Sequence, residues 1–182
     1  MKIIQKYFLA LIPPPEVFQQ VHHIKLLIQE QFGIKYALKS PPHVTLKMPF
    51  NYNEAKESVL ETKLTGFLKD KKSLNLTING ADTFGKRVIF LAITPTPELM
   101  DLQSSMKIFC KRELNLVDEL SDRNYHPHMT VAFKDLKAAR FDEILDLVKR
   151  ESFQTSFCVD SVSILKRSAQ KWNLHKNLAF LG

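Results

Sequence analysis

Two histidines and two threonines are the residues of this chain whose types and spacing could do chemistry. They stand in a short sequence that occurs twice, as PHVTL at residues 42–46 and as PHMTV at residues 127–131. His43 and Thr45 lie two positions apart, as do His128 and Thr130, and a β-strand would turn both members of each pair to one face. The alternate residues are apolar, which predicts that the opposite face of each strand is buried.

Two imidazoles and two hydroxyls around one pocket could move protons on both sides of a phosphate. Hydrolysis of a phosphate ester requires one proton to leave the nucleophile and another to reach the departing oxygen. Histidine suits both tasks because its ordinary pKa is near 6.5, and threonine can donate hydrogen bonds to the non-bridging oxygens. No carboxylate cluster or His–Cys set has metal-ligand spacing, so we expect chemistry without a metal or other cofactor.

A single His-x-Thr would be typical of a core strand with an incidental histidine, but here a longer repeat surrounds both copies. Residues 8–17 (FLALIPPPEV) align with residues 90–99 (FLAITPTPEL) at an offset of 90 − 8 = 82, and the histidines follow at 128 − 43 = 85. Each half, about 1–86 and 87–182, reads as strand, helix, His-x-Thr strand, helix, strand. The sequence therefore predicts a single bilobal α+β domain, with pseudo-twofold symmetry and a central cleft.

The other elements follow from hydrophobic periodicity and from turn residues. Helices are expected after the proline-rich turns at 13–15 and 95–97 and after each motif. Besides the two motif strands, we expect strands at residues 7–12, 74–78, 88–94, 157–165 and 172–181.

Charge and composition indicate the class of partner. The net charge of +7 favours polyanions such as RNA or nucleotides. The only two cysteines, Cys110 and Cys158, lie in apolar surroundings and are expected to be buried thiols in a reducing compartment. The N-terminal residues do not read as a signal peptide, and no apolar run approaches a membrane span, so we expect a cytoplasmic monomer.

The paired Pro-His-x-Thr-apolar motif, its spacing and the chain length resemble the two-histidine (2H) phosphoesterase superfamily. The closest resemblance is to its RNA 2′-5′ ligase-like, 2′,3′-cyclic nucleotide phosphodiesterase branch. This resemblance implies a bilobal α+β fold, metal-free chemistry and catalytic roles for His43, Thr45, His128 and Thr130. The family pattern makes His43 the general acid and His128 the general base, an assignment that depends on how the substrate lies.

The chain departs from the family after the second motif. Many relatives carry an arginine there, whereas this chain continues with Ala132, Phe133 and Lys134. Lys47 and Lys134 are candidate phosphate partners, although a solvated surface position is favoured for both. Phe133, like Phe50, could stack on a base, although a core position is favoured.

Three functions remain open at this point. The favoured one is a phosphoesterase acting on 2′,3′-cyclic phosphates of RNA ends or nucleotides. The alternatives are a ligase that joins RNA ends through 2′-5′ bonds, and a nucleotide- or RNA-binding module without turnover.

Overall fold

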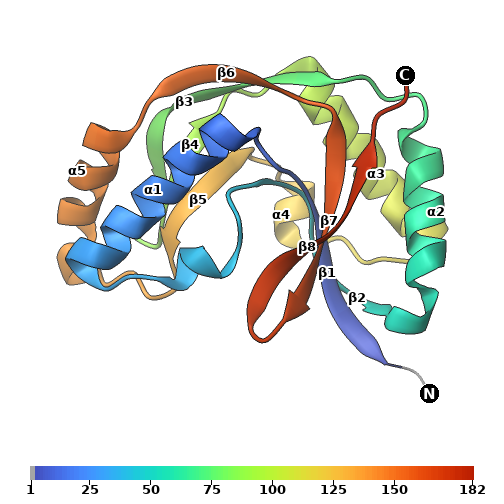
Figure 1. The fold of residues 1–182 in the computed structure, drawn as a ribbon, viewed down its shortest axis with the longest axis horizontal. Coiled ribbons are helices and arrows are strands. Elements are labelled where there is room, and N and C mark those ends of the chain that lie inside the picture. The colour runs from blue at the N-terminus through green and yellow to red at the C-terminus, as the bar shows by residue number, and fades with distance from the viewer. Residues whose placement is uncertain (1–2) are drawn as a thin grey trace.

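Two four-stranded antiparallel sheets form the frame of the protein (Figure 1). The computed structural model describes residues 3–182. The first sheet has the order β2–β1–β7–β8, and the second has the order β5–β4–β3–β6. The bounds of the strands are β1 (Ile4–Leu11), β2 (Val44–Asn53), β3 (Leu74–Phe84), β4 (Val88–Ile93), β5 (His128–Phe133), β6 (Gln154–Val159), β7 (Ser161–Ser168) and β8 (Lys171–Ala179).

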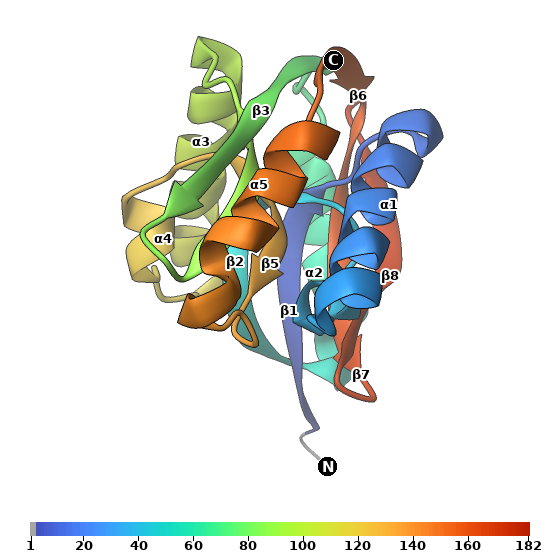
Figure 2. The same cartoon turned by 90° about the vertical axis from the view of Figure 1, so that its left-hand side faces the viewer.

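Helices cover one face of each sheet. Helices α2 (Glu57–Leu68) and α3 (Pro97–Leu114) pack on the first sheet, while α1 (Pro15–Phe32) and α5 (Phe141–Glu151) pack together on the second (Figure 2). The remaining elements are short: α4 (Leu120–Arg123), and the 3₁₀ turns η1 (Tyr36–Lys39), η2 (Glu54–Lys56) and η3 (Ala138–Arg140). The predicted bilobal α+β architecture is confirmed.

We expected each half of the sequence to form one lobe, but the lobes do not correspond to the two halves. Strand β3 belongs to the first half but pairs with β4 and β6, while β7 pairs with β1. Helix α1 follows β1 yet packs against β5, and α3 follows β4 yet packs against β2. Each lobe is therefore assembled from both halves of the chain.

The strand predicted at residues 157–165 is in fact two strands in different sheets. Phe157 and Val159 are buried in β6, whereas the next regularly buried positions are Val162 and Ile164 in β7. The apolar alternation changes phase at exposed Asp160, where the chain passes from one sheet to the other. A change of phase moves side chains to the other face, so one continuous strand could not bury all of them.

The two long helices confirm the start signals read from the repeat. Helices α1 and α3 are each 18 residues long and begin at a proline followed by a glutamate. Proline suits the first helical position because it has no N–H to satisfy, and the glutamate complements the helix dipole. Gly33 ends α1 at φ 69°, and Asn115 ends α3 at φ 53°, both in the left-handed conformation of a helix C-terminus.

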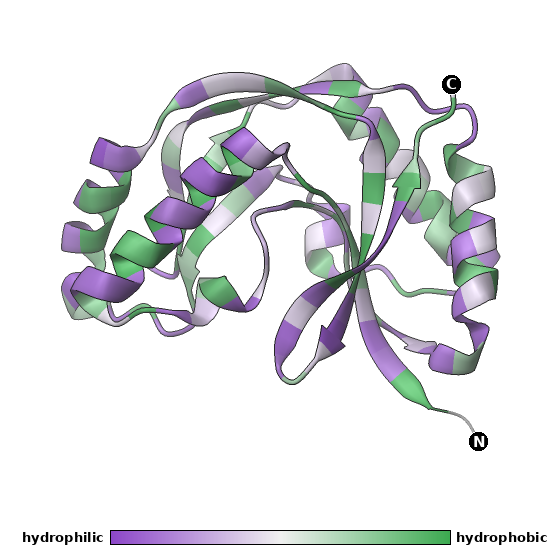
Figure 3. Cartoon of the chain, viewed as in Figure 1, coloured by the Kyte–Doolittle hydropathy of each residue, from purple (hydrophilic) through white to green (hydrophobic). Residues whose placement is uncertain are grey.

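The helix-covered faces of both sheets share one apolar core, which includes Leu9 and Leu91. The helices turn their hydrophobic stripes toward it (Figure 3). On the other face of the first sheet, Phe8, Ala10 and Leu165 form a separate small cluster, with Ile12 and Trp172 packed against it.

The cysteine prediction is half right. Cys110 is buried in α3, but Cys158 is exposed because it alternates with the inward-facing Phe157 and Val159. Within residues 3–182, no helix is long and apolar enough to cross a membrane.

Candidate active site

The two motif strands lie against each other, each at the edge of its own sheet. His43 immediately precedes β2, and His128 is the first residue of β5. Both histidines and both threonines are half-buried, and the residues between and after them, as predicted, are buried: Val44, Leu46, Met129 and Val131.

Pairing with the neighbouring strands shows which face carries the motifs. Thr45 lies opposite Ala10, whose face is the one that no helix covers. Thr130 lies opposite Phe90, and His128 lies opposite Ala92. Directly opposed residues share a face, so each His-x-Thr pair projects from the side of its sheet away from the helices.

The two imidazoles are held in the same way. The Nδ1 atom of His43 lies 2.6 Å from the carbonyl oxygen of Pro41, and that of His128 lies 2.6 Å from the carbonyl oxygen of His126. A carbonyl only accepts, so Nδ1 must carry the hydrogen in both rings. This leaves Nε2 as the atom of each ring that can take or give a proton.

An aromatic ring supports each imidazole from the neighbouring strand. The ring centroids of Phe8 and His43 are 4.9 Å apart, and those of Phe90 and His128 are also 4.9 Å apart. Phe84 adds an edge contact to His128 at 5.0 Å. Phe8 and Phe90 correspond in the sequence repeat, so both copies of the repeat restrict their imidazole with a matched phenyl ring.

Both imidazoles favour the neutral form in the free protein. The pKa of His43 is lowered to about 4; burial is the largest cause, the nearby charges of Lys25 and His128 also lower it, and the Pro41 carbonyl opposes them. Burial also lowers the pKa of His128, and the carbonyl of His126 opposes this effect. Because His128 acts on the pKa of His43, the two imidazoles are near enough to interact.

Lys47 is not a phosphate partner, and it is not on the solvated surface. The pairing between β1 and β2 shifts by one residue at Leu46: Thr45 lies opposite Ala10, but Lys47 lies opposite Leu9. This β-bulge turns Lys47 to the core face, where it is fully buried. There it forms an ion pair with Asp122 and donates a hydrogen bond to the carbonyl of Val117 at 2.8 Å.

Lys134 and Phe133 lie together beside a residue that the sequence did not single out. Lys134 is exposed, as the favoured prediction had it, and its Nζ lies 3.0 Å from the hydroxyl of Tyr36. Phe133 is half-buried, with its ring edge-on to Tyr36 at 5.0 Å, whereas Phe50 is in the core as favoured. Asp135 accepts hydrogen bonds from the backbone N–H groups of residues 35 and 36, so Tyr36 is held beside the end of β5.

Sequence reasoning also missed Lys25. It is buried in α1, and its Nζ donates to the carbonyls of Ala37 and Ser40, each at 3.1 Å. It thereby fixes the segment that ends at Pro41, whose carbonyl holds His43. Burial lowers the pKa of Lys25 to about 7. Its position within the apolar stripe of α1, four residues after Val21, was the available signal.

Among residues 3–182, no group of three or more His, Cys, Asp or Glu side chains is placed to hold a metal ion.

Similarity to known proteins specifies both the class of this chain, which is that of phosphoesterases, and its family. Residues 13–171 match the family model of the 2′-5′ RNA ligase superfamily, so the chain belongs to that superfamily. A protein of Bacillus cytotoxicus that carries the name phosphoesterase is 30% identical over 156 residues, covering 82% of this chain and 84% of that protein. A similarly named protein of Oceanobacillus iheyensis is 25% identical, covering 94% and 95%.

Solved structures show the same fold at lower identity. Escherichia coli LigT, in a crystal with 3′-AMP, aligns with a TM-score of 0.64 at 17% identity, covering all of both chains. LigT crystallised with NADP⁺ aligns with a TM-score of 0.66 at 20% identity, covering 99% of this chain and 100% of LigT.

Proposed function

We propose that this phosphoesterase opens 2′,3′-cyclic phosphates of RNA ends or nucleotides without a metal, through His43 and His128 assisted by Thr45 and Thr130. The observation that carries the proposal is that the same kinds of contact hold the two imidazoles. Each Nδ1 is fixed by a carbonyl at 2.6 Å and each ring is supported by a phenyl group, so each Nε2 is available for proton transfer.

The reaction needs both imidazoles because its two proton transfers occur on opposite sides of phosphorus. One Nε2 takes a proton from the attacking water while the other donates a proton to the departing ribose oxygen. The two threonine hydroxyls, on the same faces as the histidines, donate to the non-bridging oxygens, where negative charge must be held. Each positioned acid or base contributes about 10²–10⁴ to the rate.

We infer the roles of the two histidines from their surroundings. Burial lowers the pKa of both imidazoles, but the shift is larger for His43, whose pKa falls to about 4, than for His128. His43 is therefore the imidazole that stays neutral, as a base must, and His128 is the one that is more readily protonated. We therefore assign His43 as base and His128 as acid for hydrolysis, the reverse of the assignment implied by the family pattern. A bound phosphate anion raises both pKa values and supplies the conditions for a protonated acid.

The alternative reaction is 2′-5′ joining of RNA ends, in which a ribose hydroxyl replaces water as the nucleophile and loses its proton to the same base, while the same acid protonates the departing oxygen. The family to which the chain belongs supports it as the second candidate. The nucleotides in the LigT crystals support a nucleotide ligand for this protein under either reaction. We place the protein in the cytoplasm on the sequence argument alone.

The direct test is turnover of 2′,3′-cyclic nucleotides and of RNA ending in a cyclic phosphate, with excess chelator present. We expect hydrolysis to survive the chelator and to fall about 10²–10⁴-fold in His43→Ala and in His128→Ala. His23→Ala, an exposed histidine of α1, is the matched control and keeps full activity. Full turnover in both single variants would refute the mechanism. Nucleotide binding by the wild-type protein without any turnover would favour the third alternative, a binding module.

An activated substrate assigns the roles. With a p-nitrophenyl phosphodiester, the departing phenolate needs no proton, so a variant that lacks the acid recovers activity and one that lacks the base does not. We expect recovery in His128→Ala. Recovery in His43→Ala instead would restore the assignment implied by the family pattern.

A further inference from the structure

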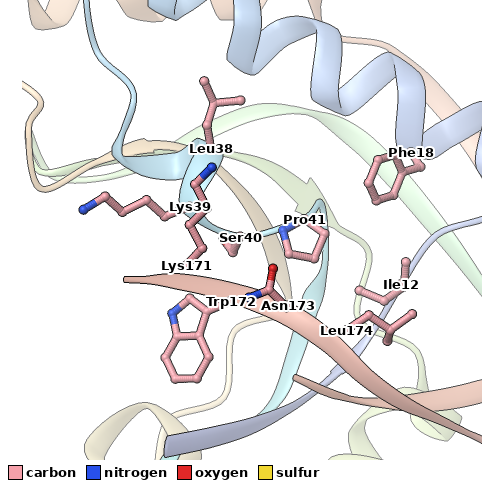
Figure 4. A pocket seen from close by; sticks show the side chains of 10 residues that line it. All are labelled: Ile12, Phe18, Leu38, Lys39, Ser40, Pro41, Lys171, Trp172, Asn173 and Leu174. Atoms are coloured by element: carbon pink, nitrogen blue, oxygen red, sulfur yellow. The ribbon is translucent and has the colours of Figure 1, made fainter. Parts of the chain in front are cut away.

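A pocket of about 390 Å³ lies beside the segment that holds His43. One wall comes from the end of η1 and the residues after it, including Lys39 and Pro41, and the facing wall comes from β8, including Lys171 and Trp172 (Figure 4). Pro41 is also the residue whose carbonyl fixes the imidazole of His43. The pocket and the proposed site therefore share a structural element.

Aromatic rings connect this pocket with the proposed catalytic pair. Trp172 packs edge-on against Phe8 at 4.8 Å, and Phe8 lies 4.9 Å from His43. Phe8 is itself buried, whereas Trp172 is half-exposed. A base stacked on Trp172 would therefore lie beyond Phe8, away from His43. Such a base would belong to a neighbouring nucleotide and not to the nucleoside that carries the reacting phosphate.

Positive charge surrounds the pocket. Lys39 and Lys171 line it, and the residues lining it include no carboxylate. The guanidinium of Arg167 lies over the ring of Trp172 at 5.6 Å. Lys39 and Lys134 both lie over the ring of Tyr36, at 4.7 and 4.6 Å.

Of these groups, Arg167, Lys171 and Trp172 belong to the β7–β8 hairpin, whose end is hydrophilic (Figure 3). Arg167 and Trp172 are opposed in the ladder, so both project from one face. That face also carries Leu165, opposite Phe8, and so it is the face of the proposed site.

An aromatic platform set among cations is the arrangement that binds single-stranded nucleic acid: bases stack on the rings and phosphates meet the positive charges. We propose that Trp172 stacks the base of the nucleotide preceding the cyclic-phosphate nucleotide, with Lys39, Lys171 and Arg167 facing the backbone phosphates. The preferred substrate is then an RNA chain rather than a mononucleotide. This inference rests on the proposed function for the placement of the cyclic phosphate, but its binding test does not require turnover.

The binding test uses the fact that Trp172 is the only tryptophan of the chain, so intrinsic fluorescence reports on this pocket directly. A His43→Ala/His128→Ala protein is titrated with uridine 2′,3′-cyclic phosphate, with a dinucleotide and with a ten-nucleotide RNA, the last two ending in a cyclic phosphate. We expect quenching by the dinucleotide and the longer RNA and none by the mononucleotide. Quenching by the mononucleotide alone, or by no ligand, would overturn the proposal.

The kinetic test compares the same substrates in Trp172→Ala. Loss of one base–aromatic stack is expected to lower kcat/KM about 5- to 150-fold more for the dinucleotide than for the mononucleotide, which has no second base to stack on Trp172. An equal loss on both substrates would mean that Trp172 only supports Phe8. Trp172→Phe keeps a stacking ring and is expected to retain the dinucleotide preference.

Charge variants keep the proposal falsifiable if Trp172→Ala does not fold. Lys39→Ala and Lys171→Ala should weaken RNA binding, and each should reduce the slope of log K against log salt by about 0.7. Lys111→Ala, an exposed lysine of α3, is the matched control and should leave the slope unchanged. Unchanged slopes in both Lys39→Ala and Lys171→Ala would refute the backbone contacts. Quenching by RNA without any turnover would refute the proposed function and leave this site standing.

Discussion

The neutral state of His43 in the free protein has a consequence that can be measured as stability. Burial, with the charge of Lys25, lowers the pKa of His43 from 6.5 to about 4 in the folded protein. The unfolded chain therefore binds a proton at this residue at a higher pH than the folded protein does. The contribution of the neutral His43 imidazole to the unfolding free energy is complete above pH 6.5 and is lost as the pH falls toward 4.

The size of the loss follows from the two pKa values. One pKa unit corresponds to about 1.4 kcal/mol, so lowering from 6.5 to about 4 costs about 3 kcal/mol of unfolding free energy at acid pH. Many carboxylates titrate in the same range, so wild type alone cannot show this effect. The measurement is the difference between wild type and His43→Gln, which lacks the titrating group and keeps a polar side chain.

Urea unfolding at a series of pH values from 7 to 4 gives that difference. We expect wild type to lose about 3 kcal/mol more than His43→Gln over this interval. In NMR titration, the His43 Cε1–H resonance should have its midpoint near 4, and Lys25→Met should move this midpoint upward without restoring 6.5, because burial is the larger cause. Parallel stability curves, or a midpoint near 6.5, would refute both the neutral imidazole and its assignment as base.

Two further outcomes follow from the contacts of the site. Lys47→Ala leaves the buried carboxylate of Asp122 without its partner, and should lower the unfolding free energy in urea by about 3–5 kcal/mol, whereas exposed Lys111→Ala should stay within about 0.5 kcal/mol of wild type. Similar values for the two lysine variants would contradict the buried pair. In turnover assays, the double variant of His43 and His128 to alanine should lose less than the product of the two single losses, because the two act as one unit; strictly multiplicative losses would indicate independent roles.

The sequence was sufficient to predict the motif strands, because face alternation is a local property. His and Thr two positions apart must share a face of a strand, and the buried Val44 and Met129 show that they do. Proline followed by glutamate was sufficient for the starts of α1 and α3 for the same local reason. The paired imidazoles required the repeat as well, since nothing within either motif specifies its partner.

The features that could not be predicted depend on contacts between distant residues. The assembly of each lobe from both halves is set by which strands pair, and the repeat is equally compatible with either arrangement. Tyr36 joins the surroundings of the site through Asp135, about a hundred positions away, and no local pattern announces such a contact. The break at Asp160 did leave a signal, because the apolar alternation changes phase there. The prediction of one continuous strand over residues 157–165 overlooked this change.

The ends of the two motifs explain why the residues after them can differ. In the second copy the pairing shifts at Val131, so that Phe90 lies opposite Thr130 and Ile89 lies opposite Ala132, as it shifts at Leu46 in the first. Each bulge comes one residue after the threonine and turns the following position into the core. Each copy therefore contributes one His-x-Thr pair to the site face before its strand changes face.

The residue type at the position after the bulge therefore depends on packing in the core and not on contact with the substrate. It is Lys47 in the first copy, where Asp122 provides a partner, and Ala132 in the second, where the side chain is small and apolar. In a regular strand, a lysine two residues after the threonine of the motif would share its face and could be a phosphate ligand, but the bulge turns this lysine into the core. We infer from the matched bulges that the chain is a duplicated unit with halves near 1–86 and 87–182, and that in both halves the duplication preserved the backbone irregularity that limits the motif to two residues.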